Sequence, residues 1–461
     1  MKLAKLSLVA MVVAGLASSS FAADTLADAF KNGKVTGELR AWYFDRDTGN
    51  ANPATSIPGG APAGTLGKGN ADLFSTGVIL GYITDPLYGL SFGATFQGNY
   101  APFADKDAKN LYAPDMYGSG AVLSEAYVTY TLGKTTAKVG RQFIASPLVN
   151  SSGSRMIKEA FQAAVLINTD LPNTTLVAGY SDKFQGRTSD YDRSMPGADS
   201  EMPSFKKEAV FYGAGTSRGS LGSPAGASNV FGFDGAYTAA AINKSIPNLT
   251  LTGQYLFVNA VEGTNGGDAN VFYAEGNYVV PLSNMKLLID ATYRGSRTSN
   301  ATFDSFHAEG DMYQGRVGFS ELAGFNASFA YSTVSSDQSV LLGAGNGPTT
   351  YTAPLIKGAE VTSGAGTDAY KVEVGYDFTK VGVPGLKVLG QYVKIDQDKV
   401  TTIVLNGVNV DTKSTFLEGQ IAYDLPSVKG LTLSLEYEDG KVETASTKNS
   451  NELRFRANYK F

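Results

Sequence analysis

Basic side chains recur at alternate positions near the C-terminus, where Arg454, Arg456 and Lys460 share one face of a predicted strand. Arg40 lies on the polar face of the first predicted strand. An arginine guanidinium is planar and can donate two parallel hydrogen bonds to a carboxylate. Rows of charged side chains on a channel wall select ions by their field and release them again. The pattern therefore points to reversible binding of small solutes that carry a carboxylate.

Alternation along the predicted strands also indicates which further charged residues face the lumen. The predicted basic lining is Arg40, Arg155, Lys158, Arg294, Arg316, Arg454 and Arg456, and the predicted acidic lining is Glu38, Glu125 and Asp290. Opposed basic and acidic walls would orient dipolar solutes, whereas in the simpler alternative each arginine is solvated or paired with a neighbouring acid. Clustered carboxylates can hold Ca²⁺. No compact calcium-loop spacing occurs, and we predict no metal.

The composition excludes several kinds of chemistry. The 461 residues include 53 Gly, 25 Tyr and 25 Phe, but one His and no Cys. Disulfides, Cys-ligated zinc and iron–sulfur clusters are excluded, and a multi-His metal site is impossible. We predict that His307 is an exposed loop residue, and that the protein has no catalytic residues and no cofactor. The net charge of −5 gives no electrostatic case for nucleic acid.

The N-terminal segment has the pattern of a secretory signal. Lys2 and Lys5 precede the apolar run from Leu6 to Ala17, and Ser20-Phe21-Ala22 supplies small residues around a cleavage site. No run of about 18 apolar residues follows, the length that a membrane-spanning helix needs. We predict a signal peptide at residues 1–22 and a single domain at residues 23–461.

Strands, rather than helices, must position the charged residues. Leu453, Phe455, Ala457, Tyr459 and Phe461 alternate with Glu452, Arg454, Arg456, Asn458 and Lys460, and similar alternation recurs along the chain. The aromatic residues that close the strands are typical of the two girdles of an outer-membrane barrel. They are Tyr43, Tyr82, Tyr100, Tyr278, Tyr376, Phe378, Tyr423, Tyr459 and Phe461. If Phe461 faces lipid, the polar faces line a water-filled lumen.

The connections alternate between short and long. The short ones lie at residues 84–89, 133–134, 169–173, 243–248, 281–285, 321–324, 379–385 and 424–430. Long, polar, Gly-rich stretches separate them, among them residues 47–70, 185–228 and 335–367. This predicts an all-β, transmembrane antiparallel barrel of about 18 strands, with short periplasmic turns and long extracellular loops. A soluble sandwich or propeller would not require this alternation of connections.

Several blocks resemble the OprD family of outer-membrane porins. They are Leu26–Asp47 (LADAFKNGKVTGELRAWYFDRD), Ala126–Gln142 (AYVTYTLGKTTAKVGRQ), Ser154–Leu166 (SRMIKEAFQAAVL) and Ala178–Phe184 (AGYSDKF), together with the terminal Phe461. The chain departs from the family's third-loop pattern, since Lys158, Gln162 and Ala163 stand where Pro, Glu and Gly are usual. The major outer-membrane protein type of porin is a near alternative.

The resemblance implies an 18-stranded channel in the bacterial outer membrane, at the surface of a Gram-negative cell. It also implies one loop folded inward and a row of basic side chains on the wall, with Arg155 and Lys158 at the narrowest point. The implied partners are outer-membrane lipid and lipopolysaccharide, small solutes, the barrel-assembly machinery, and two further copies if the protein is a homotrimer. We expect passive diffusion of small polar solutes and ions along an arginine-lined path. The alternative is a structural or adhesive surface barrel.

Overall fold

The computed structural model describes residues 23–48, 69–112, 116–187, 202–213, 230–261, 267–299, 308–398, 404–405, 408–409, 412–443 and 448–461. The predicted signal peptide and His307 lie outside the described residues.

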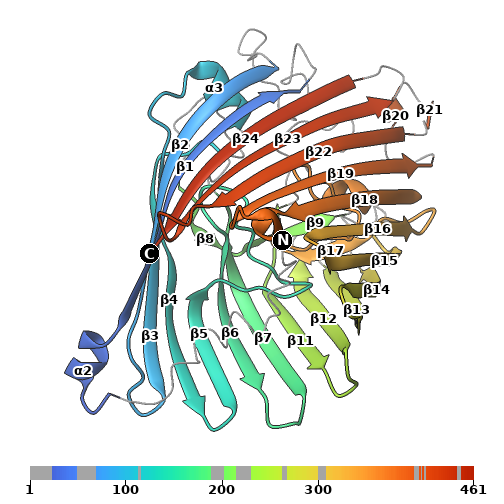
Figure 1. Cartoon of the computed structure of the whole chain (residues 1–461). Coiled ribbons are helices and arrows are strands. Elements are labelled where there is room, and N and C mark those ends of the chain that lie inside the picture. Colours follow the sequence, from blue (N-terminus) through green and yellow to red (C-terminus); the bar gives the residue numbers. More distant parts are fainter. Residues whose placement is uncertain are drawn as a thin grey trace.

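The strands form one closed antiparallel barrel of 18 strands, as predicted (Figure 1). β1 (Lys34–Asp47) pairs with its neighbour β2 (Asn70–Ile83) and with the last strand, β24 (Lys448–Lys460), which closes the ring. The first half of the ring continues with β3 (Leu90–Tyr100), β4 (Gly120–Leu132), β5 (Thr135–Gln142), β6 (Ala160–Asn168), β7 (Thr174–Gln185), β11 (Gly235–Asn243) and β12 (Leu249–Val261). The second half comprises β13 (Gly267–Pro281), β14 (Lys286–Thr298), β15 (Asp311–Leu322), β16 (Phe325–Val334), β18 (Thr367–Asp377), β19 (Leu386–Gln397), β22 (Thr412–Asp424) and β23 (Leu431–Glu443).

The remaining elements lie in the connections. They are α2 (Leu26–Lys31), α3 (Lys106–Tyr112), β8 (Phe205–Lys206), β9 (Glu208–Gly213), β10 (Val230–Gly232), β17 (Leu341–Ala344), η1 (Ala359–Thr362), η2 (Phe378–Val381), β20 (Val404–Leu405) and β21 (Val408–Asn409). β9 pairs with β10 and β17 in a separate small sheet, which lies within the ring of strands (Figure 1). No helix of the described ranges is long and apolar enough to cross a membrane.

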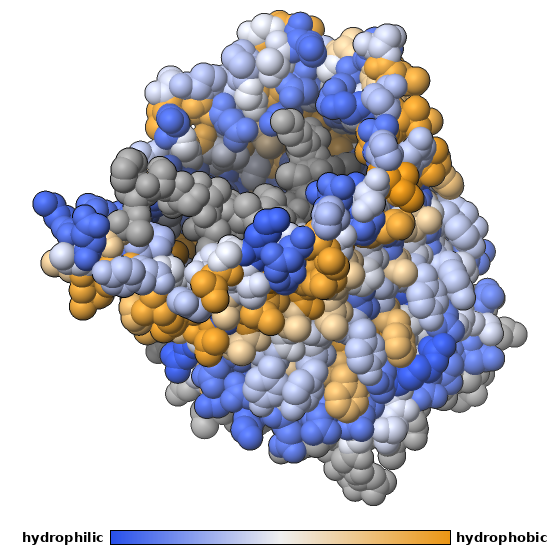
Figure 2. Space-filling model, turned by 90° about the horizontal axis from the view of Figure 1, so that it is seen from below, coloured by the Kyte–Doolittle hydropathy of each residue, from blue (hydrophilic) through white to orange (hydrophobic). Residues whose placement is uncertain are grey.

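The outer face of the barrel carries the apolar side chains that alternation requires. Leu39, Leu80 and Val372 are exposed, whereas their lumen-facing neighbours Arg40, Gly81 and Lys371 are partly or fully buried. Viewed from below, apolar residues gather along the outside of the ring, which is hollow within (Figure 2). In lipid every backbone N–H and C=O must find a partner, and a closed barrel provides one along each strand.

Aromatic pairs, most of them on neighbouring strands, form belts near both ends of the outer face. Tyr459 and Phe461 lie 6.0 Å apart at the short-turn end, and Phe325 and Tyr376 lie 4.5 Å apart there. Towards the long-loop end the pairs are Tyr180–Tyr237, Tyr255–Phe272, Tyr293–Tyr313 and Tyr331–Tyr370. Amphipathic rings favour the two membrane–water interfaces, and these belts therefore mark the membrane-embedded band.

The closure of the barrel supplies a first prediction. A Cβ on Gly37 of β1 would meet the ring of Phe461 at 2.2 Å, because the C-terminal residue packs over this glycine. Gly37→Val should displace the ring and destabilise the barrel by about 1–3 kcal/mol, the usual cost of overpacking. The temperature at which the folded band disappears in heat-modifiability gels measures this loss of stability. We expect that temperature to be lower for Gly37→Val than for the unsubstituted protein. Gly315→Val is the matched control because nothing lies within 4 Å of its added Cβ; an equal loss in both variants would contradict the prediction.

Candidate functional site: a lumen narrowed by two inward loops

The connection between β5 and β6, residues 143–159, folds into the barrel as predicted. The Arg40 guanidinium on the wall donates to the carbonyl oxygens of Arg155 and Met156, both at 3.0 Å. Gln97 on β3 accepts from the Lys158 N–H at 2.9 Å and donates to the Lys158 carbonyl at 2.9 Å. Buried irregular backbone needs such partners because it forms no ladder of its own.

A second connection, residues 335–366 between β16 and β18, also folds inward, which the sequence analysis did not predict. The guanidinium of Arg294 donates to the carbonyl oxygens of Leu342 and Thr349. The Tyr351 N–H donates to Gln314 Oε1 at 2.8 Å, and its hydroxyl donates to Glu275 at 2.6 Å. The wall of β13–β15 thus holds the first part of this loop.

Wall carboxylates on two other strands, β22 and β23, hold the tip of the same loop. Glu418 Oε1 on β22 accepts from the N–H groups of Leu355 and Ile356, at 2.6 and 3.1 Å. Glu438 lies directly across from Glu418 on β23 and accepts from the N–H of Lys357 at 3.0 Å. Three consecutive backbone donors therefore point at two wall carboxylates, and the loop reaches across the lumen from β14 to β23.

The two inward loops join each other inside the barrel. Glu159 is completely buried and accepts hydrogen bonds from the Ser152 N–H, at 2.8 Å, and from the Asn346 N–H, at 2.9 Å. The Asn346 side-chain amide donates to the other carboxylate oxygen of Glu159. Val149 and Ala344 form a parallel bridge beside this contact. Burial raises the pKa of the Glu159 carboxyl, and the surrounding donors oppose that shift.

Part of the lumen wall is apolar where the loops rest on it. Leu256 and Val258 of β12 and Val271 of β13 are buried against Leu148 and Leu341 of the two loops. The sequence analysis expected polar lumen faces throughout, and this part of the wall is different because irregular loops inside a barrel need an apolar surface to pack on.

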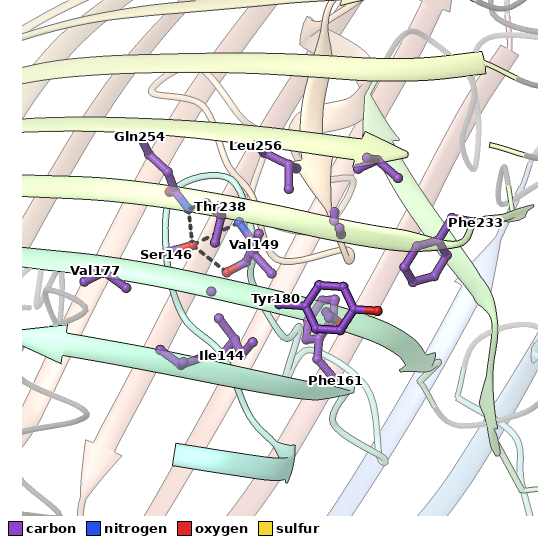
Figure 3. Close-up of a pocket in the computed structure, with 16 residues that line it drawn as sticks. Ile144, Ser146, Val149, Phe161, Val177, Tyr180, Phe233, Thr238, Gln254 and Leu256 are labelled. Atoms are coloured by element: carbon purple, nitrogen blue, oxygen red, sulfur yellow. Dashed lines mark hydrogen bonds between the residues drawn. The ribbon is translucent and has the colours of Figure 1, made fainter. Parts of the chain in front are cut away.

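A small apolar cavity of about 40 Å³ lies in this region, behind the start of loop 143–159 (Figure 3). At its edge, the Gln254 amide donates to Ser146 Oγ and to Thr238 Oγ1, both at 2.9 Å. Gln254 Oε1 accepts from the Leu148 N–H. The cavity is small and lined mostly by apolar side chains, so it is packing space behind the loop rather than part of a path for polar solutes.

The predicted basic residues near the barrel closure are paired with acids. Arg40 Nε lies 2.7 Å from Glu38 Oε1, and the Arg456 guanidinium lies 2.7 Å from both oxygens of Glu436. Both guanidinium groups contact the ring of Trp42, whose centre lies 4.9 Å from Arg40 and 4.8 Å from Arg456. These two cation–π contacts hold both guanidinium groups against the same ring.

The other predicted arginines are also engaged. Arg454 Nε lies 2.7 Å from Glu452, and Arg316 Nε donates to Asp290 Oδ2 at 2.7 Å. Arg294 is fully buried beneath loop 335–366. The structure therefore divides the predicted set: Arg294, Arg316 and Asp290 lie on β14 and β15, far around the ring from the closure where the others gather.

Lys158 differs from these arginines. Within the described ranges it forms no ion pair, and its ammonium lies 4.3 Å from the centre of the Phe143 ring. Burial lowers its pKa, an effect that nearby Arg40 and Lys138 reinforce and that Glu125 opposes. Predicted Glu125 accepts from Thr95 Oγ1 at 2.6 Å and from the Phe143 N–H at 3.0 Å. Arg155 is buried nearby and donates to Ser154 Oγ at 3.1 Å.

Sequence reasoning missed the residues that anchor the loops. Glu159 and the glutamines Gln97, Gln254 and Gln314 perform this role, yet none was a predicted site residue. Trp42, which contacts Arg40 and Arg456, was also not predicted. The available signal was alternation, which places the three glutamines on the lumen face of their strands. A glutamine amide there can both donate to and accept from the backbone of a loop. The described parts of the chain contain no group of three or more His, Asp or Glu residues placed to hold a metal ion.

Comparison with known proteins agrees with this architecture. The family model for "outer membrane porin, OprD family" matches residues 93–217. No curated protein matches the sequence.

Solved structures of OprD/Occ porins share the fold at low identity. Acinetobacter baumannii OccAB3 is similar with a TM-score of 0.71 at 14% identity, covering 94% of this chain and 99% of that chain. Pseudomonas aeruginosa OpdQ gives 0.66 at 18%, and P. aeruginosa OpdK with vanillate gives 0.70 at 13%, each with the same coverage. The resemblance to OprD-type outer-membrane porins is confirmed.

Proposed function

We propose that this OprD-like barrel is a water-filled outer-membrane channel for passive diffusion of small polar solutes, with a preference for those that carry a carboxylate. The family match and the closed barrel support the channel and its place in the bacterial outer membrane. The preference is our inference from the charges inside the lumen. Residues 1–22 are its proposed export signal.

The single observation that carries the preference is Lys158. Its ammonium stands on an inward loop near Arg40 and Lys138 as well as Glu125 and Glu38, and it forms no ion pair with the described residues. An ammonium offers three donors and no acceptor. A passing carboxylate can accept from it without displacing a hydrogen-bonded acid, whereas Arg40, Arg316, Arg454 and Arg456 are each paired with an acid. Arg294 is buried and donates to loop carbonyls.

A solved relative offers a compatible chemistry. P. aeruginosa OpdK was solved with vanillate, a molecule that carries a carboxylate. The paired arginines would contribute orientation rather than net charge, because Arg456–Glu436 and Arg40–Glu38 present dipoles to the lumen. Weak, exchangeable contacts of this kind are what permeation requires.

The charge of Lys158 should set the ion preference. In planar bilayers under a salt gradient, Lys158→Gln should move the reversal potential towards cations and lower benzoate flux in liposome swelling, with little change for uncharged sugars. A shift of about tenfold in permeability ratio corresponds to about 1.4 kcal/mol. Lys380→Gln, in the exposed turn helix η2, is the matched control. Equal reversal potentials for Lys158→Gln and the unsubstituted protein would refute the preference.

The alternative remains a structural or adhesive barrel with little conductance. Absence of any conductance from folded, heat-modifiable protein would favour it. The family to which the match points consists of channels rather than enzymes, and we propose no catalytic step. Lipopolysaccharide around the outer face, the barrel-assembly machinery acting on Phe461, and a homotrimer are further proposals.

A further inference from the structure

The short helix α2 stands outside the barrel, at the end where the short turns lie (Figure 1). Three backbone or hydroxyl contacts fix its position. The Ala23 N–H donates to the Pro86 carbonyl at 2.9 Å, and the Asp85 N–H donates to the Ala29 carbonyl at 2.9 Å. The Tyr82 hydroxyl donates to the Phe30 carbonyl. The helix is therefore docked on the β2–β3 turn.

Tyr82 shows which way the helix faces. It belongs to the outward, lipid-facing set of β2, since it alternates with buried Gly81 and shares its face with exposed Leu80. The Phe30 ring stacks on Tyr82 with centroids 6.5 Å apart and planes 17° from parallel. The outer apolar face of the barrel thus continues onto the helix.

The helix extends that apolar face with two exposed side chains. Leu26 and Phe30 are four residues apart and lie on one side of the helix; they are 57% and 52% exposed. Val35 follows the helix closely in the sequence, at the start of β1, and is 58% exposed. Ala29, in contrast, is buried, so the exposed apolar face is the one that carries Leu26 and the outer side of the Phe30 ring.

We propose that α2 is a membrane-interface element whose Leu26 and Phe30 lie among the phospholipids of the periplasmic leaflet. The continuity with the lipid-facing band favours lipid over water or a second copy of the chain. Amphipathic rings and leucines at such a boundary bury apolar area while nearby charges reach the headgroups. Lys31 and Lys34 lie at the barrel end of the helix and supply those charges.

The single tryptophan of the chain allows a direct test. In a Trp42→Phe background, Phe30→Trp is reconstituted into phosphatidylcholine vesicles whose acyl chains carry bromine near the headgroup. We expect quenching comparable to that of Leu132→Trp in the same background, a position 69% exposed at the same end of β4. The unsubstituted protein, whose Trp42 is buried on the lumen side, is the unquenched control.

The alternative outcomes are distinct. Red-shifted, unquenched emission from Phe30→Trp would place the helix in water, and blue-shifted, unquenched emission would place it against protein; each overturns the proposal. Leu26→Trp is the second variant should Phe30→Trp fail to give the heat-modifiable folded form. The result does not depend on ion preference or conductance.

Discussion

Replacing Glu159 by Leu should weaken the junction between the two inward loops and widen the lumen. The buried N–H of Ser152 and the partly buried N–H of Asn346 would lose their shared acceptor. Each buried donor left without a partner costs about 1–3 kcal/mol. The joined arrangement should therefore lose at least about tenfold in population relative to separated loops, since 1.4 kcal/mol is a factor of ten.

Single-channel recording measures this release. We expect Glu159→Leu to give larger and noisier current steps than the unsubstituted protein, with the barrel still folded by heat modifiability. Glu159→Gln is the matched control, because its amide oxygen can accept the same two backbone N–H groups and the Asn346 amide can turn to meet its NH₂. Quiet, unchanged conductance in Glu159→Leu would show that the junction does not hold the loops.

The pH dependence of the same junction has a defined sign. Burial raises the Glu159 pKa in the joined arrangement above its value in separated, solvated loops. The joined arrangement therefore binds the proton more tightly, and it gains stability as the pH falls through that raised pKa towards the ordinary glutamate value. Current noise that depends on Glu159 should decrease on acidification in the unsubstituted protein and stay constant in Glu159→Gln. Noise that increases with acid and depends on Glu159 would contradict this.

The barrel itself could be predicted because a period of two in side-chain polarity leaves few solutions in lipid. The short turns could be predicted equally well, because connections as short as residues 133–134 cannot cross a lumen. Loop 143–159 was predicted to fold inward from the resemblance of Ser154–Leu166 to a known family. The local pattern of residues 335–366 does not predict that this loop also folds inward. The side chains that bind its backbone, Arg294, Gln314 and Glu418, lie on strands far from it in the sequence.

The predicted lining residues show the limit of parity arguments. Parity placed Arg40 and Arg294 on the lumen side, yet both guanidinium groups donate to loop carbonyls rather than to an open path. The sequence cannot reveal this because the inward loops reach the wall only in three dimensions. An arginine at a lumen position is equally suited to bind a solute carboxylate or a backbone carbonyl, and the buried backbone is always present.

Glu418→Leu should detach the tip of loop 335–366 from the wall. This substitution removes the acceptor of two consecutive backbone N–H groups, those of Leu355 and Ile356. Near the tip it leaves the Glu438 contact to Lys357 and the Lys371 contact to the Ala353 carbonyl. Two unpartnered donors cost about 2–6 kcal/mol together, whereas each remaining hydrogen bond contributes about 0.5–1.5 kcal/mol. The tip should move into the lumen water, where its N–H groups can be solvated.

Lys357 makes that movement measurable, because trypsin cleaves after lysine only where the backbone is accessible. Trypsin added to the folded, reconstituted Glu418→Leu protein should cut after Lys357 many times faster than it cuts the unsubstituted protein, where this backbone is tied to Glu438. Glu418→Gln keeps an acceptor oxygen facing the loop and should stay resistant, which separates loss of the hydrogen bonds from loss of the charge. Equal resistance in Glu418→Leu would show that the contacts of Tyr351 with Gln314 and Glu275 suffice to hold the loop. In that case the wall of β13–β15, rather than the carboxylates of β22 and β23, sets the position of the second constriction loop.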